Sequence, residues 1–211
     1  LPGINCMGRN KIAGLILAGG ENKRMHGRKK AFLQYKEKPF WKWIAAVMNE
    51  TDKIYISVAR KTDYELYGES CFEKFQLVED LYEKRGPLGG ILSGLSICEE
   101  NALLVMPCDM IGCTHKIIEE LISTFQKNGN PVFYKDKDIV LPFPGIYTKS
   151  MIPQIEEMIE NRNYRLRDLI QKNTPAISYL RRQEIQKMLK NVNTLEEYEE
   201  LLHDSNRGSN R

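Results

Sequence analysis

The amino-acid sequence predicts a single α/β domain built on a doubly wound, mostly parallel β-sheet with an antiparallel edge. The first observation is that short apolar segments alternate with segments of helical periodicity from residue 12 to about residue 135. The second is the composition of the 211 residues, 42% hydrophobic and 28% charged, which allows an ordinary core without disulfides or zinc. The third is a later apolar stretch with two prolines, typical of an edge or irregular strand.

Four buried strands are expected in the first part of the chain. Each is apolar or β-branched, and two of them stop directly at glycine or at an acidic residue. They are expected at residues 12–18, 53–59, 75–78 and 102–106. Helices are expected between and after them, at residues 39–50, 62–68 and 115–127, and from the turn at 86–90 to about residue 99.

The last third of the chain is expected to add strands at 131–134, 139–147 and 176–180 and helices at 151–161, 165–172 and 194–202. The pattern Thr194-x-x-Glu197 predicts a capping box at the start of the last helix. We therefore expect one domain over residues 11–203, with a flexible N-terminal extension at 1–10 and a disordered polar tail at 204–211.

Charge and cysteine usage exclude several classes of function. The 31 basic and 28 acidic residues give a net charge of +3, too small for sequence-independent nucleic-acid binding. No apolar run approaches the length of about 18 residues that a membrane span needs. Five cysteines without a C-x-x-C pair, and three scattered histidines, argue against a structural zinc site. We expect a cytoplasmic protein with reduced thiols and no nucleic-acid or membrane partner.

Three segments fall at the carboxyl ends of expected strands, where an open α/β sheet binds its ligands. They are Leu17-Ala18-Gly19-Gly20 with its basic loop, Glu79-Asp80, and Cys108-Asp109. Glycines let the backbone approach phosphate oxygens, and the loop after them supplies Arg24, Arg28, Lys29 and Lys30. A carboxylate at a nearby strand end is the hard ligand that Mg²⁺ prefers.

Each of these features also has an ordinary structural interpretation. A glycine pair after a strand can be a tight turn, a basic loop can be solvated surface, and an aspartate can end a strand or cap a helix. The loop contains neither a G-x-x-x-x-G-K-[ST] nor a G-x-G-x-x-G motif. The combination of glycines, basic residues and carboxylates at neighbouring strand ends favours a nucleotide site over these separate interpretations.

The order of the motifs resembles one family of nucleotidyltransferases with a Rossmann-like, GT-A-type fold. The segment from Leu17 to Lys30, with the pattern L-A-G-G-x-x-x-R-M-x-G-x-x-K, is similar to the first motif of the molybdenum cofactor guanylyltransferase family. Later segments resemble the family's other motifs in order, over about residues 11 to 203. These are Val78-Glu79-Asp80, Gly86-Pro87-Leu88-Gly89-Gly90, Pro107-Cys108-Asp109, Leu141-Pro142-Phe143 and Asn191-Val192-Asn193-Thr194.

The resemblance implies transfer of GMP from GTP to molybdopterin, with Mg²⁺ as cofactor and release of pyrophosphate. It implies that molybdoenzymes or their chaperones are further partners. It also assigns roles to particular residues. Nucleotide contacts are implied for Leu17, Ala18, Gly19, Gly20 and Asp80, triphosphate contacts for Arg24 and Lys30, Mg²⁺ for Asp109, and the molybdopterin side for Asn191 and Asn193. Catalysis would rest on Lys30, Arg24 and Asp109.

The sequence departs from the family pattern at two positions, His26 in place of a usual glycine and Lys29 in place of a usual aspartate. Two alternatives therefore stay open. One is a related transferase with another nucleotide or acceptor, such as a cytidylyltransferase or a sugar-phosphate nucleotidyltransferase. The other is a nucleotide-binding assembly protein without catalytic activity. Gly19 stands where cytidylyl relatives more often carry alanine, which favours GTP.

Overall fold

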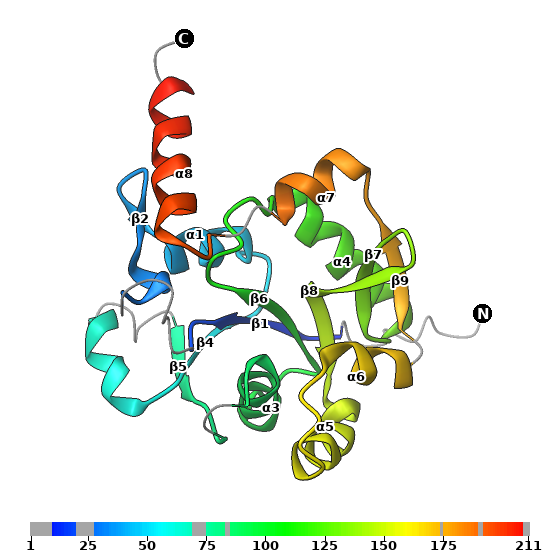
Figure 1. Ribbon diagram of the computed structural model, residues 1–211. Coiled ribbons are helices and arrows are strands. Elements are labelled where there is room, and N and C mark those ends of the chain that lie inside the picture. The colour runs from blue at the N-terminus through cyan, green and yellow to red at the C-terminus, as the bar shows by residue number, and fades with distance from the viewer. Residues whose placement is uncertain are drawn as a thin grey trace, which may run out of the picture.

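Seven strands form the central sheet of the computed structural model, in the order β5-β4-β1-β6-β8-β7-β9 (Figure 1). The structure describes residues 10–19, 28–68, 75–82, 85–173, 175–189 and 192–208. The strands of this sheet are β1 (Ile12–Leu17), β4 (Ile54–Val58), β5 (Phe75–Glu79), β6 (Ala102–Pro107), β7 (Val132–Asp136), β8 (Ile139–Thr148) and β9 (Ala176–Tyr179). The predicted fold class is confirmed.

Helices cover both faces of the sheet because its central strands are apolar on both sides. In β1, Ile12 and Ile16 belong to the core cluster on one face and Ala13 and Leu15 to the cluster on the other. The first cluster also holds side chains of α1 (Phe40–Val47) and α4 (His115–Asn128). The second holds side chains of α3 (Pro87–Ile97), α5 (Ile152–Glu160) and α6 (Leu166–Lys172).

The antiparallel strand lies inside the sheet, so the expected antiparallel edge is corrected. β8 pairs antiparallel with β6 on one side and with β7 on the other. The prolines at 142 and 144 are tolerated because the register with β7 jumps from Leu141 to Gly145, and pairing with β6 also stops at Gly145. Residues 142–144 thus form a bulge in which no ladder hydrogen bond is lost to proline.

Several smaller elements differ from the prediction. The expected helix at 62–68 is the 3₁₀ helix η3 (Lys61–Tyr67), and helix α7 (Arg182–Met188) was not expected. Two further 3₁₀ helices and a two-stranded hairpin are also present: η2 (Lys30–Phe32), η4 (Lys149–Met151), β2 (Gln34–Tyr35) and β3 (Lys38–Pro39). Among the described residues, no helix is long and apolar enough to cross a membrane.

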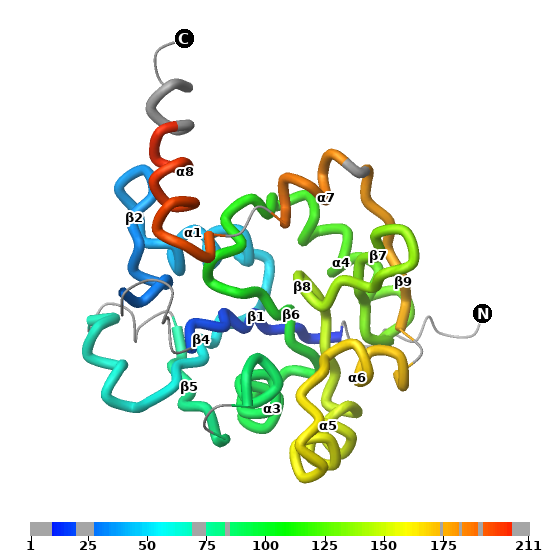
Figure 2. Tube along the Cα trace, viewed as in Figure 1, coloured from blue at the N-terminus to red at the C-terminus, as the bar shows by residue number. Residues whose placement is uncertain are grey.

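The last helix, α8 (Leu195–Gly208), projects from the body beside β2 (Figure 2). Its expected capping box is present, since the Glu197 amide donates to Thr194 Oγ1 and the Thr194 amide donates to Glu197 Oε2, both at 3.2 Å. Tyr198 attaches the helix by donating to the carbonyl of Gln34 at 2.7 Å. The helix ends at Gly208 rather than near residue 202, so five residues of the expected tail are helical.

Candidate active site

The three predicted segments meet at one edge of the sheet. Strands β1, β4, β5 and β6 are parallel, so their carboxyl ends share this edge. Backbone hydrogen bonds continue past the strands: the Ala18 amide donates to the Ser57 carbonyl at 2.9 Å, and the Cys108 amide donates to the Leu17 carbonyl at 3.1 Å. The Asp80 amide likewise donates to the Val58 carbonyl at 3.0 Å. We call this region the strand-end crevice.

Lys30 joins three distant parts of the chain in the crevice. Its Nζ donates to Asp109 Oδ2 at 2.8 Å and to Asn193 Oδ1 at 2.9 Å. Lys30 begins η2 after the basic loop, Asp109 follows β6, and Asn193 lies just before α8. The Lys30 and Asp109 side chains are only 18% and 11% exposed, so solvent screens this charge pair weakly. The structure therefore brings together one predicted phosphate ligand, the predicted metal ligand and one predicted acceptor contact.

Asp80 lies in a tight enclosure at the end of β5. Ser57 Oγ, at the end of β4, donates a 2.5 Å hydrogen bond to Asp80 Oδ1. A Cβ at Gly19 would come within 3.1 Å of Asp80 Oδ2, and a Cβ at Gly90 would come within 3.2 Å of Oδ1. Glycine at both positions lets β1 and the first turn of α3 approach the carboxylate closely.

The two glycine contacts also place Leu17 beside this enclosure. A Cβ at Gly90 would lie 2.9 Å from Leu17 Cδ2 and 2.6 Å from Ser57 Oγ. The glycine-rich start of α3 thus packs directly on the end of β1. The geometry explains why Gly90, at the start of α3, belongs to the same site as Gly19, although some 70 residues separate them in the sequence.

Burial changes the ionisation of two groups in the crevice. It raises the pKa of the Asp80 carboxyl; the hydrogen bond from Ser57 lowers that pKa, and the nearby Glu79 charge adds to the increase. Burial also raises the pKa of the Cys108 thiol. Because the thiol form is neutral and weakly nucleophilic, Cys108 is not suited to covalent catalysis. Among the described residues, the ion pair of the crevice is the one between Lys30 and Asp109.

Lys29, one of the two departures from the family pattern, points away from Asp109. Its Nζ forms an ion pair with Asp63 of η3, and its side chain is 35% exposed. The neighbouring lysines therefore have different partners, Asp63 for Lys29 and Asp109 for Lys30. The position of Lys30 in the crevice does not depend on an aspartate at residue 29.

Other predicted residues are only partly placed. Leu17 and Ala18 are half-buried, at the end of β1. Gly20, Arg24, His26 and Asn191 lie outside the described residues, so their predicted roles stay predictions. Sequence reasoning missed Ser57, although a hydroxyl near the end of the otherwise apolar strand 54–58 could have identified it. It also missed Asp63, whose partner depends on the fold.

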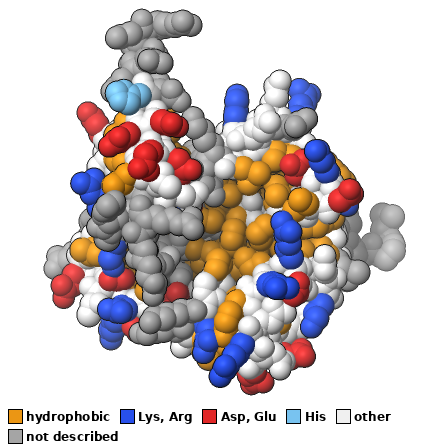
Figure 3. All heavy atoms as spheres, viewed as in Figure 1, with side chains coloured by type: hydrophobic (Ala, Val, Ile, Leu, Met, Phe, Trp, Pro, Cys, Tyr) orange, Lys and Arg blue, Asp and Glu red, His pale blue; other side chains and the backbone are white. Residues whose placement is uncertain are grey.

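An apolar surface adjoins the crevice on the β8 side. Because β8 runs antiparallel to β6 and their pairing ends at Val105 and Gly145, residues 139–144 extend past the carboxyl end of β6. Val140, Leu141 and Phe143 are half-buried, and Ile139 is 48% exposed. Figure 3 shows hydrophobic side chains gathered around the place that β8 has in Figure 1. Leu141 and Phe143 pack against the same core cluster, so together they present one apolar surface beside the crevice.

A mostly parallel sheet with glycines, a lysine and a buried aspartate at its strand ends is typical of a nucleotide-binding α/β protein. Residues 14–177 match the model of the MobA-like NTP transferase domain, and the chain belongs to this family. The family prediction is therefore confirmed.

Similar proteins cover nearly the whole chain. It is 30% identical to a probable molybdenum cofactor guanylyltransferase of Clostridium perfringens, over 91% of this chain and 96% of that protein. It is 26% identical to a protein of the same name from Geobacillus, over 92% of this chain and 99% of that protein. Its fold is similar to that of molybdopterin-guanine dinucleotide biosynthesis protein A from Archaeoglobus fulgidus, with a TM-score of 0.74, 17% identity, and coverage of 92% of this chain and 99% of that one.

Proposed function

We propose that this protein transfers GMP from GTP to molybdopterin and releases pyrophosphate. The observation that carries the proposal is the contact of Lys30 with both Asp109 and Asn193. It joins the predicted phosphate-binding lysine, the predicted metal ligand and a residue of the C-terminal motif in one hydrogen-bond network, and this supports the proposal. The relatives from Clostridium perfringens and Geobacillus are named probable molybdenum cofactor guanylyltransferases, which supports GTP as donor and molybdopterin as acceptor.

The terminal phosphate of molybdopterin acts as the nucleophile in this reaction. One of its oxygens forms a bond to the α-phosphorus of GTP, and the bond from the α-phosphorus to the bridging oxygen of pyrophosphate breaks. A phosphate monoester is already anionic at neutral pH, so the reaction needs no histidine or carboxylate as general base. Catalysis then depends on positioning and on neutralising charge around the α-phosphorus.

The described residues divide this task between them. The backbone around Gly19 can approach the nucleotide because no side chain intervenes, and Lys30 neutralises phosphate charge. When the triphosphate binds, Lys30 exchanges part of its contact with Asp109 for phosphate oxygens. Arg24 and Gly20 are expected to add a second cation and a backbone amide.

Asp109 is suited to hold Mg²⁺. Its carboxylate is 11% exposed, and among the described residues only Lys30 donates a side-chain hydrogen bond to it. A nearly buried carboxylate with one cationic partner can exchange that partner for a hard divalent cation, with phosphate oxygens as further ligands. Bound there, Mg²⁺ supplies charge neutralisation at the triphosphate.

The acceptor is expected to lie on the β8 side of the crevice. The surface formed by Leu141 and Phe143 offers apolar contact to the pterin ring system, while Asn193 lies next to Lys30. In this arrangement the pterin phosphate approaches from the side opposite Asp80. Asn191 is expected to take part in the same subsite.

The direct test is to incubate the purified protein with molybdopterin, GTP and Mg²⁺ and to detect the guanine dinucleotide by mass spectrometry. We expect product only when all three are present. Product from CTP at an equal rate would indicate a related cytidylyltransferase. Tight GTP binding with no product from any nucleotide would indicate an assembly protein without catalytic activity.

A further inference from the structure

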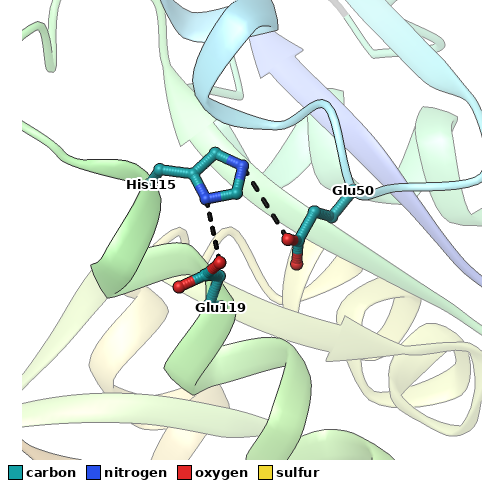
Figure 4. A group of neighbouring side chains, drawn as sticks. All are labelled: Glu50, His115 and Glu119. Atoms are coloured by element: carbon teal, nitrogen blue, oxygen red, sulfur yellow. Dashed lines mark ion pairs between the residues drawn. The ribbon is translucent and has the colours of Figure 1, made fainter.

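A second group of ligating side chains lies outside the strand-end crevice. Glu50 lies in the connection between α1 and β4, and His115 and Glu119 are four residues apart at the start of α4 (Figure 4). One ligand atom from each of the three lies within 4.8 Å of the other two. Glu50 precedes the first residue of β4, whereas the crevice lies where β4 ends, so the two sites share no residue.

The contacts of His115 determine which ring nitrogen carries a proton. Its Nε2 lies 2.5 Å from the amide oxygen Oδ1 of Asn49. An amide oxygen only accepts hydrogen bonds, so Nε2 must be the donor. In the neutral ring, Nδ1 then presents an unshared electron pair, and it faces Glu119 Oε1 at 3.3 Å. Two acceptors at this distance repel each other unless a cation, either a proton or a metal ion, lies between them.

The geometry fits a metal ion in that position. Two ligands bound at about 2.0–2.1 Å in a tetrahedral zinc site are about 3.4 Å apart. The 3.3 Å separation of His115 Nδ1 from Glu119 Oε1 matches this spacing. Glu50 Oε1 lies 3.9 Å from His115 Nε2 (Figure 4). The Glu50 side chain is 39% exposed, so it can rotate toward Nδ1 to supply a third ligand. A histidine that gives its other N–H to an oxygen acceptor, as His115 does to Asn49, is the usual arrangement of a metal-binding histidine.

The charge of these three side chains also favours a bound cation. Two glutamates and one histidine carry a formal charge of −2 with a neutral imidazole and −1 with an imidazolium. Among the described residues, His115 is the only cationic side chain within ion-pair distance of Glu50 or Glu119. A divalent cation compensates the remaining charge. One nitrogen and two carboxylate oxygens suit Zn²⁺ and similar transition ions, whereas Mg²⁺ prefers oxygen ligands and water.

We propose that Glu50, His115 and Glu119 form a binding site for a divalent transition-metal ion of the Zn²⁺ type. The ion would be coordinated by residues of both the start of α4 and the connection that follows α1, and so would stabilise their contact. Asn49 acts as a positioning residue, because its amide oxygen holds the protonated Nε2 and turns Nδ1 toward the ion. The site is separate from the Mg²⁺ site proposed at Asp109. The cysteine-spacing argument could not predict it, because no cysteine takes part.

The test is calorimetric titration of the chelator-treated full-length chain with ZnCl₂. His115→Ala and Glu119→Gln should each lose one equivalent of bound Zn²⁺ relative to the unmodified chain. Asn49→Ala should weaken binding by about 10–100-fold. The matched controls are His203→Ala, at an exposed histidine of α8, and Glu157→Gln, at an exposed glutamate of α5, and both should keep the equivalent.

A second measurement excludes misfolding as the cause of any loss. In chelator, His115→Ala and the unmodified chain should have the same unfolding temperature. Zn²⁺ should raise the unfolding temperature of the unmodified chain more than that of His115→Ala. Excess Mg²⁺ should not displace the bound ion. If His115→Ala keeps the full number of zinc equivalents, or if the unmodified chain binds none, the group is an ordinary surface ion pair and the proposal is wrong.

Discussion

Replacing Lys30 by alanine tests the catalytic role proposed for this lysine. The substitution removes the donor to Asp109 and Asn193 and leaves a carboxylate of 11% exposure without its cation. Deleting one preorganised charge-stabilising group costs about 10²–10³-fold in turnover, or about 2.7–4 kcal/mol in the activation free energy. We expect that loss in kcat for guanylyl transfer at saturating GTP and Mg²⁺.

The same substitution should also lower the free energy of unfolding. A nearly buried carboxylate that loses its partner costs about 1–3 kcal/mol, so Lys30→Ala should remain folded but unfold at lower urea concentration. Measuring urea unfolding beside turnover separates the two effects. A fold that is lost outright would mean that Lys30 is mainly a structural residue.

Lys29→Ala is the matched control, at the adjacent lysine. Lys29 pairs with Asp63 at a site 35% exposed, and exposed ion pairs contribute about 0–1 kcal/mol. Its turnover should therefore fall by less than about tenfold, which corresponds to about 1.4 kcal/mol. A larger loss at Lys29 than at Lys30 would refute the assignment of Lys30 as the phosphate-binding lysine.

Four further outcomes are expected. Asp109→Asn should abolish transfer and keep the fold, because the amide keeps the shape but not the anionic oxygen; wild-type turnover at limiting Mg²⁺ would contradict this. Asp80→Asn should be more stable than the unmodified chain at neutral pH, because burial raises the pKa of Asp80 and its ionisation therefore opposes folding. The gain in the free energy of unfolding should be absent below about pH 4 and should grow as the pH rises through the native pKa of Asp80. Urea unfolding of both proteins at several pH values tests this, and a difference between them that does not change with pH would disprove it. Gly90→Ala should lower the free energy of unfolding by about 1–3 kcal/mol, because its Cβ would lie 2.6 Å from Ser57 Oγ. An unchanged free energy of unfolding would show that the first turn of α3 can move. GTP should bind on the order of a hundredfold more tightly than CTP or ATP, because two unpaired polar contacts each cost about 1–3 kcal/mol. Equal calorimetric affinities would contradict that preference.

The buried strands were predictable because their residues are apolar on both faces. Residues 12–17 and 102–107 need no tertiary information, since a short apolar run bounded by glycine or aspartate is typical of a central parallel strand. The position of β8 was not predictable in the same way. Two prolines predict an edge or an irregular strand, and only the register shift with β7 shows that β8 is an irregular interior strand.

The site was predictable where residues follow strands directly, and less so where contacts are long-range. Asp80 and Asp109 could be identified as candidate site residues because each directly follows the end of a strand. The partners of Lys29 and Lys30 cannot be read from the sequence, because the two lysines are adjacent and only the fold separates Asp63 from Asp109. For the same reason, the approach of His115 to Glu50 depends on how α4 packs beside the connection that follows α1.

The most direct test of the proposed function follows the phosphorus atoms of GTP. The protein is incubated with molybdopterin and Mg²⁺, and with GTP labelled either at the α- or at the γ-phosphorus. Transfer of GMP predicts that the α-label enters the molybdopterin product and the γ-label leaves as pyrophosphate. If the γ-label entered the product, or if neither label did so in the presence of Mg²⁺, guanylyl transfer would be contradicted.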